Sequence, residues 1–290
     1  MGRGGGGGDS QDLQMGVKDI TNRMAPYLQP LAWTTLIANI LIVVTGGVVR
    51  LTGSGLGCPT WPQCQGNSLV PHGAVNHHKI IEFSNRSLTD VLVVIAIVTV
   101  VAAWTTPHRK QAVWIALGIP AQAVLGGITV LTDLNPWVVS LHLMLSMAII
   151  ALSVRLLLTV LGRCSAPDVL GVAQGLAAAA VLYLGTVVTG AGPHAGDEKA
   201  HRNGLSALQT AQLHTDAVML LTGLTIALVV LRRSPAAYAL LAAVVVNAVI
   251  GFVQYFTHLP IPLVAAHMFG ASLVAAASTW VLLERRNSLA

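Results

Sequence analysis

Eight long apolar runs constrain this chain more than any other feature of its sequence. They fall at residues 31–50, 86–104, 112–131, 137–160, 169–190, 208–231, 237–257 and 261–283. A helix of about 20 apolar residues is long enough to cross a bilayer. Only 9% of the residues are charged, whereas a soluble domain has about a quarter. The sequence therefore predicts an all-α polytopic membrane protein with eight transmembrane helices, surrounded mainly by lipid.

The basic residues predict how these helices are oriented. Lys and Arg gather before the first helix, after the last one and in every second connection between them. They are Lys18, Arg23, Arg109, Lys110, Arg155, Arg163, Arg232, Arg233, Arg285 and Arg286. The positive-inside rule assigns that side to the cytoplasm. We therefore expect a multi-pass protein of a bacterial-type inner membrane, with both termini in the cytoplasm.

The same distribution bears on the start of the chain and on its partners. Residues 1–26 open with MGRGGGGGDSQDLQ, which has no apolar core of a signal peptide and is expected to be a flexible cytoplasmic tail. The positive-inside distribution already accounts for most of the basic residues. The net charge of +5 therefore requires no nucleic-acid partner.

The first outer connection, residues 51–77, contains Cys58 and Cys64 in the segment CPTWPQC. Two nearby cysteines on the oxidising side of a membrane can form a disulfide. The same pair can bind a metal, although one pair without further ligands at the usual spacing is weak support for a zinc site. Cysteine spacing leaves both interpretations open.

The two halves of the chain resemble each other. QAVLGGITVLTDLNPWVVSLH (122–142) aligns without a gap with NAVIGFVQYFTHLPIPLVAAH (247–267). Upstream, VVRLTGSG (48–55) matches VVTGAG (187–192) once two residues are removed. We expect two tandem four-helix bundles, residues 27–165 and 166–290. An even number of spans per unit predicts a pseudo-two-fold axis along the membrane normal.

Three histidines fall near the outer ends of their helices, at similar depth: His142, His214 and His267. Ionisable residues inside a membrane usually face the bundle interior and mark function. Neutral imidazole is a common ligand of haem iron. A pair on facing helices, such as His214 and His267, can hold one haem within a four-helix unit. The alternative for a single histidine is an interhelical hydrogen bond.

The segment NHHKIIEFSNRSLTD (76–90) introduces the second helix. If that helix extends outward past its apolar run, His78, Glu82 and Asn85 share one face. Asn85 best matches the position of His214, although a second alignment places Leu88 there. Glu82 has no acidic counterpart, because Ala211 takes its place. The two halves are therefore predicted to do different work.

Together these residues carry a family resemblance. TGGVVRLTGSGLGCPTWPQCQG (45–66), then IEFSNR (81–86) and the three histidines, resemble the haem A synthase family over roughly residues 27–284. The resemblance implies an inner-membrane oxidoreductase that oxidises the C8 methyl group of haem O to a formyl group. The product, haem A, serves cytochrome oxidase. Handover from a haem O synthase and delivery to oxidase assembly are further implications.

The resemblance also implies a set of site residues. Haem b would be a bound cofactor of the C-terminal half, with His214 and His267 as its axial ligands. Haem O, the substrate, would occupy the N-terminal half with His142 as one ligand. Glu82 would act close to the substrate, and Cys58 and Cys64 would form an extracytoplasmic disulfide.

The chain departs from the family pattern at one position. Many members read Ile-Glu-x-x-His-Arg, where this chain has Asn85. An asparagine amide is a poor haem ligand. Either His78 supplies the bond from two turns outward, or His142 holds the substrate haem alone. We favour the second reading, because a substrate that must enter and leave needs no second strong bond.

Charged residues around this segment have more than one reading. Glu82 can stabilise positive charge as an anion or accept a proton as a base, or it can form an ion pair with Arg86 or His78. Arg50 and Arg86 can bind haem propionates or simply extend to the membrane interface.

Two rival functions share parts of this pattern. A di-haem electron-transfer protein that oxidises quinol would use the same histidines, and a quinone is also a possible acceptor for the enzyme. Such a protein gives no reason for Glu82 in only one half. A transporter requires polar or broken helices near the midplane, whereas the helix centres here are apolar.

Overall fold

Eight membrane-length helices make up the described part of the chain, which in this computed structural model is residues 16, 18–71, 76–198 and 200–285. They follow a short 3-10 helix, η1 (Ala25–Tyr27). In order they are α2 (Leu28–Leu51), α3 (His77–Ala103), α4 (Arg109–Leu131), α5 (Pro136–Val160), α6 (Val169–Ala191), α7 (Ala207–Arg232), α8 (Pro235–Phe256) and α9 (Ile261–Leu283). The predicted all-α membrane fold is confirmed. Within the expected flexible tail, residues 18–24 are helical and lead into η1. Residues 1–15 and 17 of that tail, and Arg286, lie outside the described residues.

Side-chain caps set where several helices begin. Asn76 accepts a hydrogen bond from the N–H of Lys79 at 3.0 Å and so starts α3. Asp168 caps α6 in the same way, through the N–H of Gly171 at 2.7 Å. Such caps satisfy amide groups that have no partner within the helix. The cap at Asn76 explains why α3 begins well before its apolar run, the case in which His78, Glu82 and Asn85 share one face.

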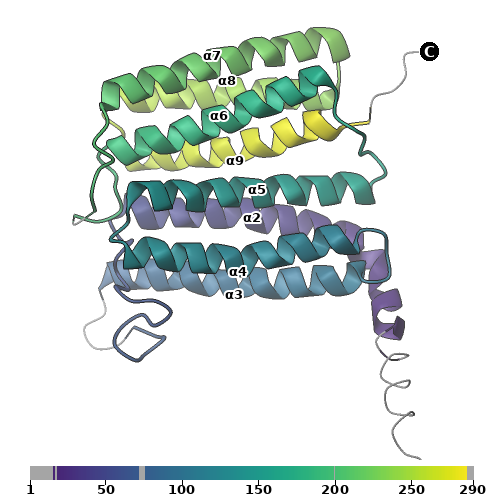
Figure 1. The fold of residues 1–290 in the computed structure, drawn as a ribbon, viewed down its shortest axis with the longest axis horizontal. Coiled ribbons are helices and arrows are strands. Elements are labelled where there is room, and N and C mark those ends of the chain that lie inside the picture. The colour runs from purple at the N-terminus through teal and green to yellow at the C-terminus, as the bar shows by residue number, and fades with distance from the viewer. Residues whose placement is uncertain (1–15, 17, 72–75, 199, 286–290) are drawn as a thin grey trace, which may run out of the picture.

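The helices form two groups (Figure 1). Helices α2 to α5 pack against one another, as do α6 to α9. The two groups meet where α2 contacts α9 and where α5 contacts α6 and α9. Buried Ile40, Ile150 and Ala275 belong to one apolar cluster across this junction. The pseudo-two-fold axis and the domain boundaries remain predictions.

The repeat found in the sequence recurs as local structure. Asp133 and Leu134, after α4, have φ of 50° and 57°, and the aligned His258 and Leu259, after α8, have φ of 63° and 60°. A left-handed conformation costs a non-glycine residue about 1–2 kcal/mol. Each leucine donates its N–H back to a helix carbonyl, at 2.8 Å for Leu134 and 2.7 Å for Leu259. The same uncommon turn thus ends both helices.

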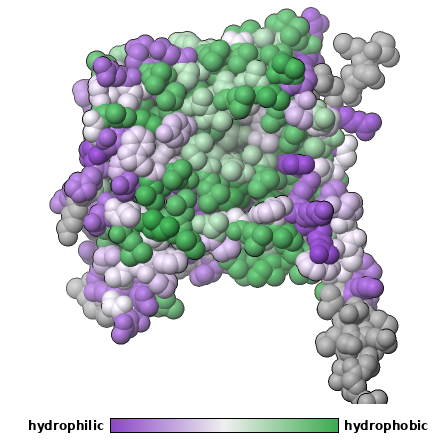
Figure 2. Space-filling view, in the orientation of Figure 1, coloured by the Kyte–Doolittle hydropathy of each residue, from purple (hydrophilic) through white to green (hydrophobic). Residues whose placement is uncertain are grey.

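Apolar side chains cover the middle of the helices, and hydrophilic ones gather at both ends (Figure 2). Large exposed residues such as Val94 (60%) and Val230 (63%) belong to this apolar surface. The start of α2 and the end of α9 lie at the same end of the molecule (Figure 1). The arrangement fits a multi-pass membrane protein with both termini on one side. Assignment of that side to the cytoplasm remains a prediction.

Candidate functional site

His214 of α7 and His267 of α9 face each other in the C-terminal half. Their ring centroids are 6.5 Å apart and the ring planes are inclined by 79°. A metal bonded to one nitrogen of each ring, at the usual distance of about 2.0–2.1 Å, separates the centroids by roughly 6 Å. The pair therefore has a spacing that suits one shared metal centre.

Both rings line a cavity between the helices of the C-terminal half, α2 and α5. The cavity has a volume of about 150 Å³. Its walls are largely apolar, with Val181, Leu221 and Val274 among them, and Asn247 and Gln254 add polar groups. An apolar pocket with a few convergent polar groups is typical of a cofactor site.

Asn247 of α8 supports His267. Its backbone carbonyl lies 3.1 Å from Nδ1 of His267. A histidine that donates Nδ1–H to a carbonyl has its ring fixed and its Nε2 lone pair free for a metal. The side-chain Oδ1 of Asn247 is buried with no partner among the described residues. The residues present therefore fit an iron-porphyrin that approaches Nε2.

Each of the three predicted histidines lies against a glycine of the preceding helix. The pairs are Gly126 with His142 (3.1 Å), Gly185 with His214 (3.2 Å) and Gly251 with His267 (3.1 Å), measured from the place of a glycine Cβ to ring Cε1. These distances are shorter than ordinary contact, so a side chain on the glycine would displace the ring. The glycines give the imidazoles room at the helix interfaces.

His142 of α5 lies in the N-terminal half. Its Nδ1 is buried and has no hydrogen-bond partner among the described residues. Gln122 of α4 donates from Nε2 to the carbonyl of His142 at 3.1 Å and to Oγ of Ser146 at 2.6 Å. The Oε1 of Gln122 is also buried without a partner in this part of the chain. Buried polar atoms are nearly always satisfied, so these orphaned atoms point to a missing ligand.

Asn85 of α3 occupies the place that corresponds to His214. Each lies the same number of residues before the end of its helix, which is Ala103 for α3 and Arg232 for α7. This register favours Asn85 over Leu88 as the match. The Oδ1 of Asn85 lies 2.8 Å from Oγ1 of Thr45 in α2.

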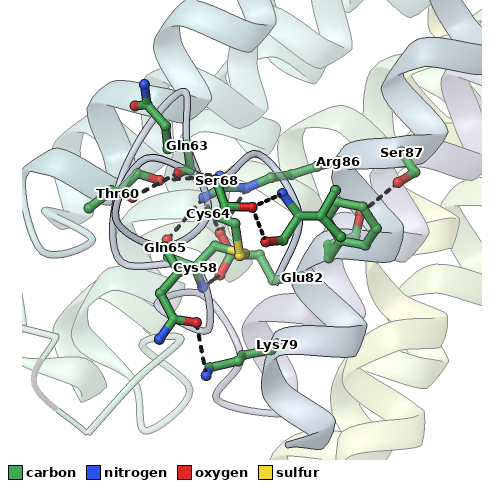
Figure 3. The surroundings of a disulfide bond; sticks show 12 residues. Cys58, Thr60, Gln63, Cys64, Gln65, Ser68, Lys79, Glu82, Arg86 and Ser87 are labelled. Atoms are coloured by element: carbon green, nitrogen blue, oxygen red, sulfur yellow. Dashed lines mark hydrogen bonds and ion pairs between the residues drawn. A yellow bond between two sulfur atoms is a disulfide. The ribbon is translucent and has the colours of Figure 1, made fainter. Parts of the chain in front are cut away.

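Glu82 is buried against the first outer loop, with its side chain 6% exposed (Figure 3). Its Oε1 accepts hydrogen bonds from Arg86, at 2.6 Å from Nη2 and 3.2 Å from Nε. Its Oε2 accepts from the N–H of Cys58 at 2.6 Å. The ion pair with Arg86 is confirmed. His78 contacts Ser54 instead, Nδ1 to Oγ at 3.0 Å.

Arg86 ties the loop to α3. It donates to the carbonyls of Cys58 at 3.0 Å, Thr60 at 3.2 Å and Gln63 at 3.3 Å (Figure 3). Within the same loop Cys58 and Cys64 form a disulfide. The disulfide interpretation is therefore confirmed, and the metal interpretation of these cysteines is wrong because both sulfur atoms are in the bond.

Arg50, at the outer end of α2, joins the two halves of the molecule. Its Nε donates to the carbonyl of His194 at 2.8 Å, and its Nη2 donates to that of Thr189 at 3.3 Å. Two of its three guanidinium nitrogens are therefore used by backbone of the C-terminal half.

Sequence reasoning missed several residues of these sites. Gln122 and Asn247 are aligned in the repeat and both carry amides, a signal that was available. Trp61 gave no such signal: its ring packs on Gly127 of α4, where a Cβ would overlap it. The loop is thus seated on α4 as well as on α3.

Fold and site together define a class: a polytopic helical membrane protein in which a pair of histidines lines a cavity between the helices. The sequence model of one family, described as cytochrome oxidase assembly protein (COX15-CtaA), matches residues 29–279. The chain belongs to this family.

Curated relatives named "Heme A synthase" align with parts of the chain. The protein of Geobacillus thermodenitrificans is 36% identical over 114 residues, which is 37% of this chain and 34% of that protein. The protein of Listeria welshimeri is 31% identical over 143 residues, 47% of each chain. The matched stretches thus span a third to a half of these relatives.

Proposed function

We propose that the protein is a haem A synthase, an oxidoreductase that oxidises the C8 methyl group of haem O to a formyl group. The observation that carries the proposal is the His214–His267 pair across a cavity, in a chain of this family. Relatives with the printed name "Heme A synthase" support the same reaction.

In the C-terminal half, His214 and His267 hold the iron of haem b. Asn247 keeps the ring of His267 oriented through its carbonyl. Bound haem b supplies one-electron redox chemistry. The apolar cavity wall keeps water from the ring and holds the cofactor inside the bundle.

In the N-terminal half, His142 holds the iron of the substrate haem O. Gln122 donates to the backbone carbonyl of His142 and to the hydroxyl of Ser146, and so holds this part of α5. Glu82 supplies a fixed negative charge beside this half. Its oxygens accept three hydrogen bonds, two from Arg86 and one from the N–H of Cys58, and these contacts favour the charged carboxylate over its protonated form. A charged Glu82 can stabilise positive character on the methyl carbon.

A propionate role for Arg50 and Arg86 competes with their backbone contacts. We propose that both arginines mainly hold the outer loops in place, and that propionate binding is secondary. The haem sites lie toward the outer face of a bacterial inner membrane. A haem O synthase supplies the substrate, cytochrome oxidase assembly receives haem A, and a quinone is a possible electron acceptor.

One observation favours a second candidate, a di-haem electron-transfer protein. Oε2 of Glu82 accepts a hydrogen bond from the N–H of Cys58 in the disulfide loop, and Oε1 accepts two from Arg86 of α3. A purely structural residue would show the same contacts. That protein would bind haem through the same histidines and leave it unmodified.

Haem extraction and chromatography distinguish these functions. The protein is expressed with a haem O synthase in a host that makes no haem A, beside a Glu82→Gln variant. We expect haem A in the wild type, and haem O or a hydroxylated intermediate in the variant. If the wild type carries haem b and leaves haem O unchanged, the synthase proposal is wrong and the electron-transfer function replaces it.

A further inference from the structure

The site in the C-terminal half contains two glycine–histidine pairs, and the N-terminal half has three of the four corresponding residues. Gly126 with His142 repeats Gly251 with His267. The remaining pair of the C-terminal half is Gly185 with His214. In the alignment of VVRLTGSG with VVTGAG, Gly185 corresponds to Gly46, and the register of α3 matches His214 with Asn85.

Gly46 of α2 has open space beside it. Ile42 and Val43, one turn earlier on the same face, pack into buried clusters with α3, α4 and α5. A Cβ on Gly46 would nevertheless meet no atom within 4 Å. The corresponding position at Gly185 is filled by the ring of His214. No side chain of the described residues therefore takes the place at Gly46 that the ring of His214 takes at Gly185.

Asn85 does not replace the missing ligand. Its amide is tied to Thr45, and an amide nitrogen has no free lone pair to offer a metal. His78 is not a substitute either. It lies seven residues earlier on α3, about 10 Å farther out along the helix axis. Its Nδ1 is bound to Ser54, and its ring lies 3.9 Å from that of His77.

On the basis of the proposed function, we propose that haem in the N-terminal half is bound by His142 alone. The iron then has an open coordination position on the side of Gly46 and Asn85. This position accepts a small neutral ligand of iron. The C-terminal haem, held on both faces by His214 and His267, has none. The two halves therefore differ in the reactivity of their iron and not only in its environment.

Carbon monoxide is the probe. Purified full-length protein is loaded with haem b, reduced and titrated, so that the test does not depend on turnover. We expect CO to bind one of the two haems in the wild type. The signal disappears in His142→Ala, in which the C-terminal haem keeps both His214 and His267. Asn85→His makes the N-terminal haem six-coordinate and low-spin and abolishes CO binding, whereas the control Asn85→Gln still binds CO.

Two haems that both resist CO in the wild type overturn the inference. If His78→Ala then creates a CO-binding haem, His78 is the ligand that was overlooked. CO binding at one haem in a protein that makes no haem A leaves this inference standing and removes the proposed function. Absence of any haem from the N-terminal half overturns both.

Discussion

At the scale of single residues, the sites depend on close contact between a ring and a glycine. The ring of His267 lies against Gly251 so tightly that a Cβ would be 3.1 Å from Cε1. The hydrogen bond to Asn247 holds the same ring from the other direction. The imidazole therefore has little freedom to adjust.

This contact predicts the effect of Gly251→Ala. The added methyl group should push the ring of His267 out of line and weaken haem binding about 10-fold, the lower end of the loss seen when the supports of a metal ligand are disturbed. Haem titration followed by absorbance measures it. Gly223→Ala in α7 is the control, because a Cβ there meets nothing within 4 Å. Equal haem affinity in the two variants would contradict the packing argument.

The buried ion pair of Glu82 and Arg86 predicts a large effect on stability. Removing Arg86 leaves a carboxylate that is 6% exposed without its counter-charge, so Arg86→Ala should lower the free energy of unfolding by about 3 kcal/mol. Arg23→Ala is the matched control. It breaks another i,i+4 pair, with Asp19, whose side chains are 79% and 62% exposed, and should cost about 0.4 kcal/mol. Denaturation in detergent compares them, and similar losses would show that burial of the first pair matters little.

At the scale of elements, the first outer loop is held to two helices independently of its disulfide. Arg86 and Glu82 bind it to α3, and Trp61 seats it on α4. Loss of one attachment should therefore loosen the loop without releasing it.

The double variant Cys58→Ser and Cys64→Ser tests this redundancy. Because the disulfide closes a short loop, its removal should cost only about 2 kcal/mol of stability. Hydrogen exchange at the loop amides should rise modestly, while the amide of Cys58, bonded to Glu82 in the native protein, should stay protected at the substituted serine. Full exchange throughout the loop would mean that the disulfide alone holds it.

The elements themselves could largely be predicted from the sequence, because hydropathy determines where a chain can cross a membrane. An outward extension of α3 was the condition under which His78, Glu82 and Asn85 share one face. The pairing of His214 with His267 followed from their similar depth near the outer ends of their helices. The contacts of Arg50 with the other half could not be predicted. They join residues far apart in the chain. The sequence around an arginine at a helix end is the same whether the side chain contacts lipid, a propionate or a backbone carbonyl.

At the scale of the whole molecule, Arg50 connects the outer ends of the two bundles. Its bonds to the carbonyls of Thr189 and His194 cross from α2 to the C-terminal half, and Gly55 donates its N–H to the carbonyl of Gly196 at 2.9 Å beside it. These contacts fix the segment after α6 in the C-terminal half relative to the segment after α2 in the N-terminal half.

Arg50→Gln should therefore weaken the junction. Hydrogen bonds from a charged donor contribute about 1.5–3 kcal/mol each, and a shorter amide cannot reach both carbonyls. We expect a lower midpoint of thermal unfolding and faster proteolysis at residues 191–198, with the haem of His214 and His267 retained. Unchanged proteolysis in this segment would show that Arg50 does not anchor it.

The division of work between the halves is the central claim, and the identity of the haem retained by two variants tests it most directly. The protein is purified from cells that also contain a haem O synthase, with His142→Ala and His267→Ala beside it, and the extracted haems are separated by chromatography. The account predicts that His142→Ala keeps haem b and loses haem O and haem A, while His267→Ala loses haem b and keeps haem O. Loss of the same haem from both variants would contradict it.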